Sequence, residues 1–352
     1  MSLKDLDDLD KKIVTELQKD FPLVEEPFKQ LAATFNLSEE EYFGRLQKLK
    51  DLKILRQISG IFDTRNLGYQ STLVASKVDP AHLEEAARII NQHPGVSHNY
   101  RRSDDFNMWY TVAVPKEHSL EETIAKLHEL SGAVSTHIMP TLHLFKIGVQ
   151  LDLTDKTKEK KEESEKKAKV FNEEERAKSR PPLTAFDVEC IRLLQEDFPL
   201  VSRPFQKIGE TQGIPEEVMI QKSKDFVTHG YVRRFAAVIH HRNAGFTANA
   251  MVVWVIPKED RDRVGRIMGG FKEISHCYER PTYPDWPYSL FTMIHGHNTK
   301  ECEAVVEQII EKCGNYPNKY LYSTTEFKKI RLKYFLPELH AWWDQHKEKV
   351  SV

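Results

Sequence analysis

The chain has 352 residues, with 51 Lys and Arg against 53 Asp and Glu, and a formal net charge of -2 at pH 7. This length suits two or more domains with cores of their own, and the near-neutral charge gives no overall attraction to nucleic acid or anionic lipid. No apolar run approaches the roughly 18 residues of a membrane span, and the start (MSLKDLDD) lacks the apolar core of a signal peptide. Four scattered cysteines without a Cys-x-x-Cys pair are typical of a reducing compartment. We therefore expect a soluble cytoplasmic protein with no membrane partner.

The sequence contains a long internal repeat. DFPLVEEPF at 20–28 recurs as DFPLVSRPF at 197–205, and VSHNYRR at 96–102 recurs as ISHCYER at 274–280. Both pairs are offset by about 177 residues, so the order and spacing of the two segments are kept. A repeat of this length predicts two copies of one larger unit rather than an array of short units.

Each copy begins with a pattern of three short helices. In copy 1 the predicted helices are 6–19, 27–35 and a third that starts at Ser38, where Glu41 completes a capping box. Together with an alternating strand at 54–62, they predict a winged helix-turn-helix module. The residues of the third helix expected to face inward are Phe43, Leu46, Leu49 and Leu52. The corresponding elements of copy 2 are 186–195, 204–212, 215–228 and 231–239.

The rest of each copy reads strand, helix, strand, strand, helix, strand, which is the ferredoxin-like βαββαβ order. In copy 1 the predicted elements are 71–78, 80–92, 96–102, 108–114, 120–130 and 134–144. In copy 2 they are 248–255, 258–268, 273–279, 289–295, 299–313 and 318–322. The predicted fold class is α+β with an internal duplication.

A run rich in Lys and Glu, closed by Pro181 and Pro182, separates the copies. It has too few apolar groups to bury, so we interpret it as a linker, either a solvated helix or a flexible tether. The predicted domains are helix-turn-helix modules at 1–62 and 183–240, ferredoxin-like domains at 63–154 and 241–337, the linker at 155–182, and a helical tail at 338–352.

Candidate functional side chains alternate along one predicted strand of each copy. They form two triads: His98, Tyr100 and Arg102, and His276, Tyr278 and Arg280. Alternate positions of a strand project to one face, so each triad groups an imidazole, a phenol and a guanidinium. A histidine beside a tyrosine is often only a hydrogen-bonded core pair. Repetition of the whole triad in two copies that otherwise diverged favours a functional role.

The predicted architecture resembles the Lrp/AsnC transcription regulators, whose second domain dimerises and senses amino acids. The recognition helix, however, begins with Glu at 39–41 in copy 1 and at 216–217 in copy 2, where phosphate contacts require positive charge. Basic residues partly offset these carboxylates in copy 1: Arg45, Lys48, Lys50 and Lys53. We therefore expect no nucleic-acid partner and keep a DNA-binding regulator that senses a small molecule or haem as the alternative.

A second resemblance is more specific. PGVSHNY at 94–100 with FNMWYT at 106–111 resembles one subunit type of the siroheme decarboxylases, and SHCYER at 275–280 with WPYSLFTMIHG at 286–296 resembles the partner type. Segments 142–149, 233–238 and 245–251 support this likeness, which covers nearly the whole chain except the linker. These enzymes share the Lrp/AsnC architecture and usually act as two related subunits, so the chain looks like a fusion of both. The resemblance implies a lyase that removes two acetate carboxyls from siroheme as CO2, giving didecarboxysiroheme on the way to haem or haem d1.

Siroheme is a flat, iron-bearing ring with many carboxylates, so its site needs an imidazole for iron, cations for carboxylates and aromatic walls. Under this resemblance His98 and His276 are iron ligands or proton donors, and Tyr100 and Tyr278 assist them. The expected substrate-binding residues are Arg101, Arg102, Arg280, Trp109, Trp286 and Lys146. Both tryptophans could equally be core residues. His143, His295 and His297 are weaker candidates, and no cofactor is expected beyond the iron of the substrate.

The two triads have unequal surroundings. Arg101 stands where copy 2 has Glu279, and the following loop is longer in copy 2 and carries Pro281, Pro284 and Pro287. We therefore expect one productive site near the interface of the two ferredoxin-like halves. A haem-binding carrier without catalysis is a third interpretation. The sequence leaves open which histidine binds iron and whether the fused chain pairs again as a homodimer.

Overall fold

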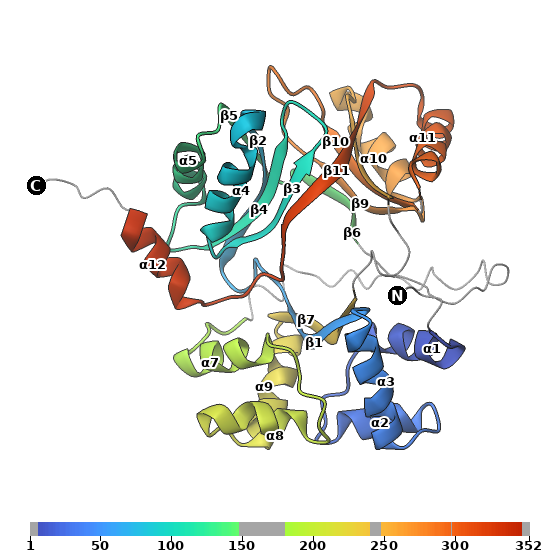
Figure 1. Ribbon diagram of the computed structural model, residues 1–352, viewed down its shortest axis with the longest axis vertical. Helices are drawn as coiled ribbons and strands as arrows, with labels where there is room; N and C mark the ends of the chain where they lie inside the picture. Colours follow the sequence, from blue (N-terminus) through green and yellow to red (C-terminus); the bar gives the residue numbers. More distant parts are fainter. Residues whose placement is uncertain (1–5, 148–179, 240–247, 297, 347–352) are drawn as a thin grey trace, which may run out of the picture. The chain divides into compact units, whose positions relative to one another are not determined.

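The computed structural model describes residues 6–147, 180–239, 248–296 and 298–346, and it divides into two compact units (Figure 1). One unit comprises residues 1–67 and 150–245 and holds both helix-turn-helix modules. The other comprises residues 68–149 and 246–352 and holds both ferredoxin-like domains. Like parts of the two copies are thus grouped together. Most of the predicted linker, residues 155–179, lies outside the described residues.

The helix-turn-helix unit contains three helices from each copy. They are α1 (Asp8–Leu17), α2 (Pro27–Ala33) and α3 (Glu39–Asp51), then α7 (Ala185–Leu194), α8 (Pro204–Gly209) with the 3-10 turn η3 (Glu210–Gln212), and α9 (Glu216–Thr228). Ser38 and Glu41 form the predicted capping box of α3. The buried face of α3 is Tyr42, Leu46 and Leu49. Phe43 lies at the edge of that face rather than at its centre, with its ring 5.3 Å from that of Phe28.

The two predicted wing strands pair with each other. β1 (Leu55–Phe62) and β7 (Val232–Ile239) form a two-stranded antiparallel sheet. The DFPLV repeat joins the modules at this sheet. The amide of Phe21 donates to the carbonyl of Phe235 at 2.7 Å, and the amide of Phe198 donates to that of Ile58 at 2.8 Å. The repeat therefore has a structural role, since each copy attaches its loop to the strand of the other.

One antiparallel sheet of nine strands runs through both ferredoxin-like domains, in the order β5-β2-β4-β3-β11-β8-β10-β9-β6. Copy 1 supplies β2 (Tyr69–Lys77), β3 (Val96–Arg102), β4 (Met108–Pro115), β5 (Ser135–Met139) and β6 (His143–Ile147). Copy 2 supplies β8 (Ala248–Trp254), β9 (Ile274–Glu279), β10 (Leu290–Gly296) and β11 (Asn318–Lys329). The helices are α4 (Leu83–Gln92), α5 (Leu120–Ser131), α10 (Arg261–Gly269), α11 (Thr299–Cys313) and α12 (Pro337–His346), with the 3-10 turns η2 (Pro80–His82) and η5 (Lys258–Asp260) preceding α4 and α10. The predicted α+β fold class is confirmed.

Two predicted strands were wrong in extent. The strand expected at 134–144 is divided at Pro140, which has no N–H for a sheet ladder: β5 stays beside β2, whereas β6 pairs with β9 of copy 2. The strand expected at 318–322 continues to Lys329, and its second half pairs with β3 of copy 1. Each copy thus sends the end of its fourth strand into the sheet of the other.

The sheet has an apolar cluster on each face. Helices cover one face, where Trp254, Ile274 and Cys277 belong to the core of copy 2, and Trp342 and Trp343 of α12 pack onto the core of copy 1. The opposite face carries a mixed cluster from both copies: Ala75, Phe106, Trp109, Met139, Met251, Val253, Trp286, Phe291 and Leu321. Strand alternation separates the two sets, since Met251 and Val253 lie between residues of the helix-covered core. Among the described residues, no helix is long and apolar enough to span a membrane.

Candidate active site

Both triads lie along the second strand of their ferredoxin-like domain, with Arg280 directly after the end of β9, and a bulge precedes each histidine. In β3 the register shifts between Val96 and His98, and the pairing of β9 with β10 shifts between Ile274 and His276. Val96 and Ile274 face the helix-covered cores. Without the irregularity, a histidine two residues later would face the same way. The bulge therefore allows the histidine to project from the opposite face of the sheet.

Within each triad the tyrosine contacts both the histidine and the arginine, as side chains on one face of a strand can. The rings of His98 and Tyr100 are stacked at 6.2 Å, and those of His276 and Tyr278 at 5.8 Å. A guanidinium then covers each tyrosine, at 5.8 Å for Arg102 and 4.9 Å for Arg280. The structure thus groups an imidazole, a phenol and a cation twice. All four rings are half-buried.

The two arginines lie at the buried end of each triad. Arg102 is 6% exposed and Arg280 is 8% exposed. Arg102 donates to the carbonyl of Leu321 at 2.8 Å, and Arg280 donates to the carbonyl of Met139. Burial lowers the pKa of each to about 10, so both remain charged at neutral pH. Within the part of the chain that the structure describes, Nε of each has no hydrogen-bond partner.

Two predicted substrate-binding residues, Arg101 and Lys146, lie elsewhere or are already engaged. Arg101 is exposed and projects between two residues of the triad, away from their face. Lys146 donates to the carbonyl of Phe271 at 2.5 Å, just beyond the end of α10, and burial lowers its pKa. In the other half, Lys328 makes similar contacts, to the carbonyl of Asn91 at 2.7 Å and to that of His93 at 3.4 Å. Lys146 therefore joins a strand to a helix end.

The two tryptophans are packed together in the mixed cluster, with ring centroids 5.3 Å apart. Trp109 donates Nε1–H to the carbonyl of Phe106 at 2.6 Å. They are not equivalent positions, because Tyr100 pairs with Trp109 whereas Tyr278 pairs with Phe291. Trp286 belongs to the longer loop of copy 2.

The structure adds a polar chain beside His276. Oγ of Ser275 lies 2.8 Å from Nδ1 of His276 and 2.7 Å from Nε2 of His295, and Nδ1 of His295 lies 2.6 Å from Oδ1 of Asn249. Burial lowers the pKa of His295 to about 4. The sequence did contain a signal for His295, since alternation places it on the same face as Met293 of the mixed cluster.

Copy 1 lacks most of this chain. Oγ of Ser97 lies 3.0 Å from Nδ1 of His98, as in copy 2. The strand registers place Ala113 where copy 2 has His295, and Ser71 where it has Asn249. The two triads therefore differ in the polar residues that follow the serine: His295 and Asn249 in copy 2 are replaced by Ala113 and Ser71 in copy 1.

The charge difference that suggested unequal sites is smaller than the sequence implied. Glu279 accepts a hydrogen bond from Nη1 of Arg261 at 3.1 Å, and both side chains are 21% exposed. Arg261 therefore balances the carboxylate that stands in place of Arg101. The polar chain, rather than Glu279, distinguishes the two triads.

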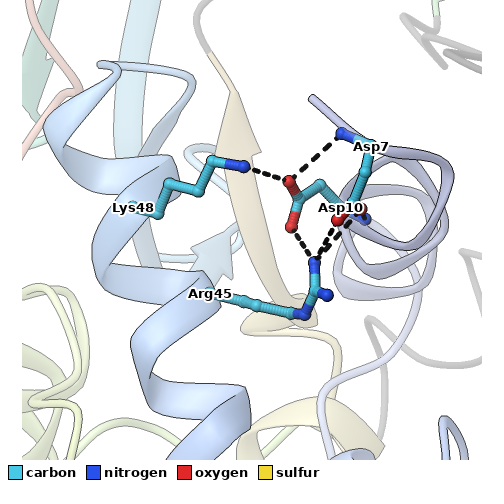
Figure 2. A network of polar contacts seen from close by, with 4 residues as sticks. All are labelled: Asp7, Asp10, Arg45 and Lys48. Carbon is cyan, nitrogen blue, oxygen red and sulfur yellow. Dashed lines mark hydrogen bonds and ion pairs between the residues drawn. The ribbon is translucent and has the colours of Figure 1, made fainter. Parts of the chain in front are cut away.

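In the helix-turn-helix unit, two basic residues of α3, Arg45 and Lys48, pair with carboxylates at the start of α1 (Figure 2). Nη1 of Arg45 lies 2.7 Å from Oδ1 of Asp10 and 2.8 Å from Oδ2 of Asp7, and Nζ of Lys48 lies 2.7 Å from Oδ2 of Asp10. The hydrogen bond with Arg45 lowers the pKa of Asp7. These cations therefore neutralise buried or capping carboxylates within the module.

Copy 2 repeats the pattern, and the starts of the recognition helices are also engaged. Lys222 of α9 lies 2.7 Å from Asp187 of α7. Glu39, the first residue of α3, accepts from the hydroxyl of Ser202 in the other copy at 2.7 Å, and Glu216 of α9 pairs with Arg203. Arg45, Lys48 and Lys222, and the first glutamate of each recognition helix, thus contact neighbouring helices or the other copy.

Comparison with known proteins defines the class. Residues 66–146 and 243–328 match the AsnC-like ligand binding domain, and residues 10–56 and 187–233 match the siroheme decarboxylase NirDL-like HTH domain. The chain is therefore a duplicated assembly of these two domain types.

Full-length similarity narrows the class to a family. The chain is 40% identical to the siroheme decarboxylase of Hydrogenobacter thermophilus over 97% of its own length and 98% of that relative. Its fold matches the crystal structure of the siroheme decarboxylase NirDL in complex with an iron-uroporphyrin III analogue, with a TM-score of 0.74, 35% identity and coverage of 96% and 98% of the two chains. A 147-residue stretch is 45% identical to the siroheme decarboxylase beta subunit of Methanosarcina barkeri, covering 42% of this chain and 97% of that subunit. The chain belongs to the siroheme decarboxylase family, which confirms the resemblance predicted from the two triad segments.

Proposed function

We propose that this chain is a lyase that decarboxylates siroheme, removing two acetate carboxyls as CO2 to give didecarboxysiroheme. The observation that carries the proposal is the 40% identity to a siroheme decarboxylase over 97% of the chain. The two-triad arrangement supports it, because each triad combines an imidazole, a phenol and a buried positive charge on one face of the sheet.

Each decarboxylation breaks the bond between an acetate methylene carbon and its carboxyl carbon. The electron pair stays on the methylene, where the conjugated ring can delocalise it, and CO2 leaves. A proton must then be added to form the methyl group. We assign His98 and His276 to iron binding and proton delivery, and Tyr100 and Tyr278 to assisting the adjacent imidazole through ring stacking.

The arginines favour an anionic substrate through their charge. Arg102 and Arg280 lie beneath Tyr100 and Tyr278 and already donate to main-chain carbonyls, so we assign them to the positive potential of this face. Trp109 and Trp286, which lie in the mixed cluster, support the aromatic wall of the proposed site. No organic cofactor takes part in this proposal, because the iron arrives with the substrate.

Anaerobic incubation with siroheme, followed by mass spectrometry of the extracted tetrapyrrole, tests the reaction. The expected result is conversion to a species lighter by two CO2, with a mono-decarboxylated intermediate at early times. The double variant His98→Ala/His276→Ala is the matched control and should leave the mass unchanged. Siroheme that is bound by the wild-type protein yet recovered intact would refute catalysis and favour a carrier.

A further inference from the structure

We propose that His295, together with Asn249 and Ser275, is a positioning residue that fixes the tautomer of His276, so that Nε2 of His276 carries the lone pair offered to the iron of the substrate. The part concerning iron rests on the proposed function. The part concerning the tautomer is a property of the substrate-free protein.

The direction of each hydrogen bond follows from counting protons. Oδ1 of Asn249 can only accept, so the proton between it and His295, 2.6 Å apart, belongs to Nδ1 of His295. A neutral imidazole carries one proton, so Nε2 of His295 must accept, and the hydroxyl of Ser275 donates to it across 2.7 Å. The carbonyl of Met293, 3.4 Å from the same Oγ, is the weaker acceptor, so the single proton of Ser275 goes to His295. The oxygen of Ser275 then accepts from Nδ1–H of His276 at 2.8 Å. The remaining ring nitrogen of His276, Nε2, is left with the lone pair.

His295 suits this task because it stays neutral. It is half-buried between β8 and β9, and its burial holds its pKa near 4. The charges of His276 and Lys329 act on it, and both disfavour a second proton on the ring. Because the neutral ring of His295 has one fixed donor and one fixed acceptor, the orientation of the Asn249 amide determines the tautomer of His276. Partners behind a metal-binding histidine commonly set its tautomer in this way.

Copy 1 has no equivalent device. Ala113 and Ser71 stand at the positions of His295 and Asn249. The chain of polar contacts therefore does not continue from Ser97 toward β4 and β2. The hydroxyl of Ser97, 3.0 Å from Nδ1 of His98, can donate or accept. The proposal therefore separates the histidines: His276 is the preformed iron ligand, and His98 is the candidate for delivering the proton.

Nitrogen NMR on histidine-labelled, substrate-free protein tests the tautomer directly, because two-bond couplings distinguish Nδ1–H from Nε2–H rings. The His276 signal is assigned by its loss in His276→Gln. We expect the Nδ1–H pattern in wild type. Asn249→Leu and His295→Leu should abolish that pattern, while Ser71→Ala, the matched change in copy 1, should leave it intact. An Nε2–H pattern for His276 in wild type, or an Nδ1–H pattern that survives His295→Leu, would overturn the proposal.

Binding of an iron uroporphyrin, followed by its optical and electron paramagnetic resonance spectra, tests the consequence. His295→Leu should weaken the histidine-ligated species about tenfold, at the low end of the effects of removing such partners. His295→Gln should restore much of it, because its amide oxygen can accept from Ser275. Tryptophan fluorescence unfolding confirms that each variant folds. If siroheme were bound but not decarboxylated while the NMR result held, the proposed reaction would fail and the tautomer assignment would stand.

Discussion

Nη1 of Arg102 lies 2.8 Å from the carbonyl oxygen of Leu321, which belongs to the other copy of the duplicated chain. Arg280 donates to the carbonyl of Met139 in the mirrored position. Both acceptors lie on the fourth strand of the opposite copy, and both belong to the mixed apolar cluster. The guanidinium of each triad therefore holds the two ferredoxin-like domains together beneath its tyrosine.

This contact predicts that Arg102→Ala loses stability as well as activity. Removing a buried charged donor and its packing should lower the free energy of unfolding by about 2–4 kcal/mol. All five tryptophans lie in residues 68–149 and 246–352, so their fluorescence during urea unfolding reports this unit. Arg101→Ala, the exposed neighbour, is the matched control and should change stability by less than about 0.5 kcal/mol. Equal stability of the two variants would show that Arg102 has no such structural role.

The ion pairs of Figure 2 predict that the helix-turn-helix unit does not read DNA. Arg45 and Lys48 are bound to Asp10, whose side chain is fully buried, and Glu39 opens the recognition helix. Fluorescence anisotropy with the protein's own upstream DNA at low salt should give only weak binding that does not depend on sequence. Arg45→Ala should leave this binding within about twofold. Tight, sequence-selective and salt-sensitive binding would instead establish the regulator.

His93 predicts a specific loss of stability in acid. It is fully buried, and burial lowers its pKa to about 3, against roughly 6.5 in an unfolded chain. Below pH 6.5 the unfolded state binds a proton at His93 that the folded state does not bind. The free energy of unfolding is therefore unaffected by this group above pH 6.5 and falls as the pH drops toward 3. The loss from this group should be roughly 2 kcal/mol at pH 5.

Phe271 supplies the matched variant for this test. Its carbonyl accepts from the amide of Ile274 as that of His93 accepts from the amide of Val96, so the two occupy equivalent turns. His93→Phe loses the hydrogen bond from the amide of Gly95 to Nδ1 and should be less stable at pH 7.5. Its further loss between pH 7.5 and 5 should nevertheless be smaller than that of wild type by roughly 2 kcal/mol. Parallel stability curves for the two proteins would contradict the buried neutral state.

The sequence predicted the local secondary structure better than it predicted which strands pair with each other. Capping at Ser38, alternation in β3 and the order of elements are local signals, and each was read correctly from residues close in the chain. The division at Pro140 could have been suspected, because proline cannot donate in a ladder. The destination of β6, beside β9, could not be predicted, because pairing between copies joins residues more than 100 positions apart.

The same limit applies to the site. The triads were found because their spacing survives within one strand, whereas Lys146 was placed with them although it donates to Phe271 on the helix-covered side. His295, in contrast, was predicted only as a weaker candidate for the site. Its partners, Asn249 and Ser275, are distant in sequence and become neighbours only through the pairing of β10 with β8 and β9.

The two triad histidines should contribute unequally to the reaction. The reason is the hydrogen-bond chain from Ser275 through His295 to Asn249, which is found beside His276. Single-turnover rates of His98→Ala and His276→Ala on saturating siroheme should differ by at least about tenfold, or roughly 1.4 kcal/mol. We expect the larger loss of rate in His98→Ala, because loss of a proton donor is not overcome by more substrate. His276→Ala should mainly weaken binding, since it removes the imidazole whose Nε2 is prepared by His295. Equal losses of rate would indicate two equivalent sites or one site shared symmetrically, and full activity in both variants would remove the triads from the mechanism.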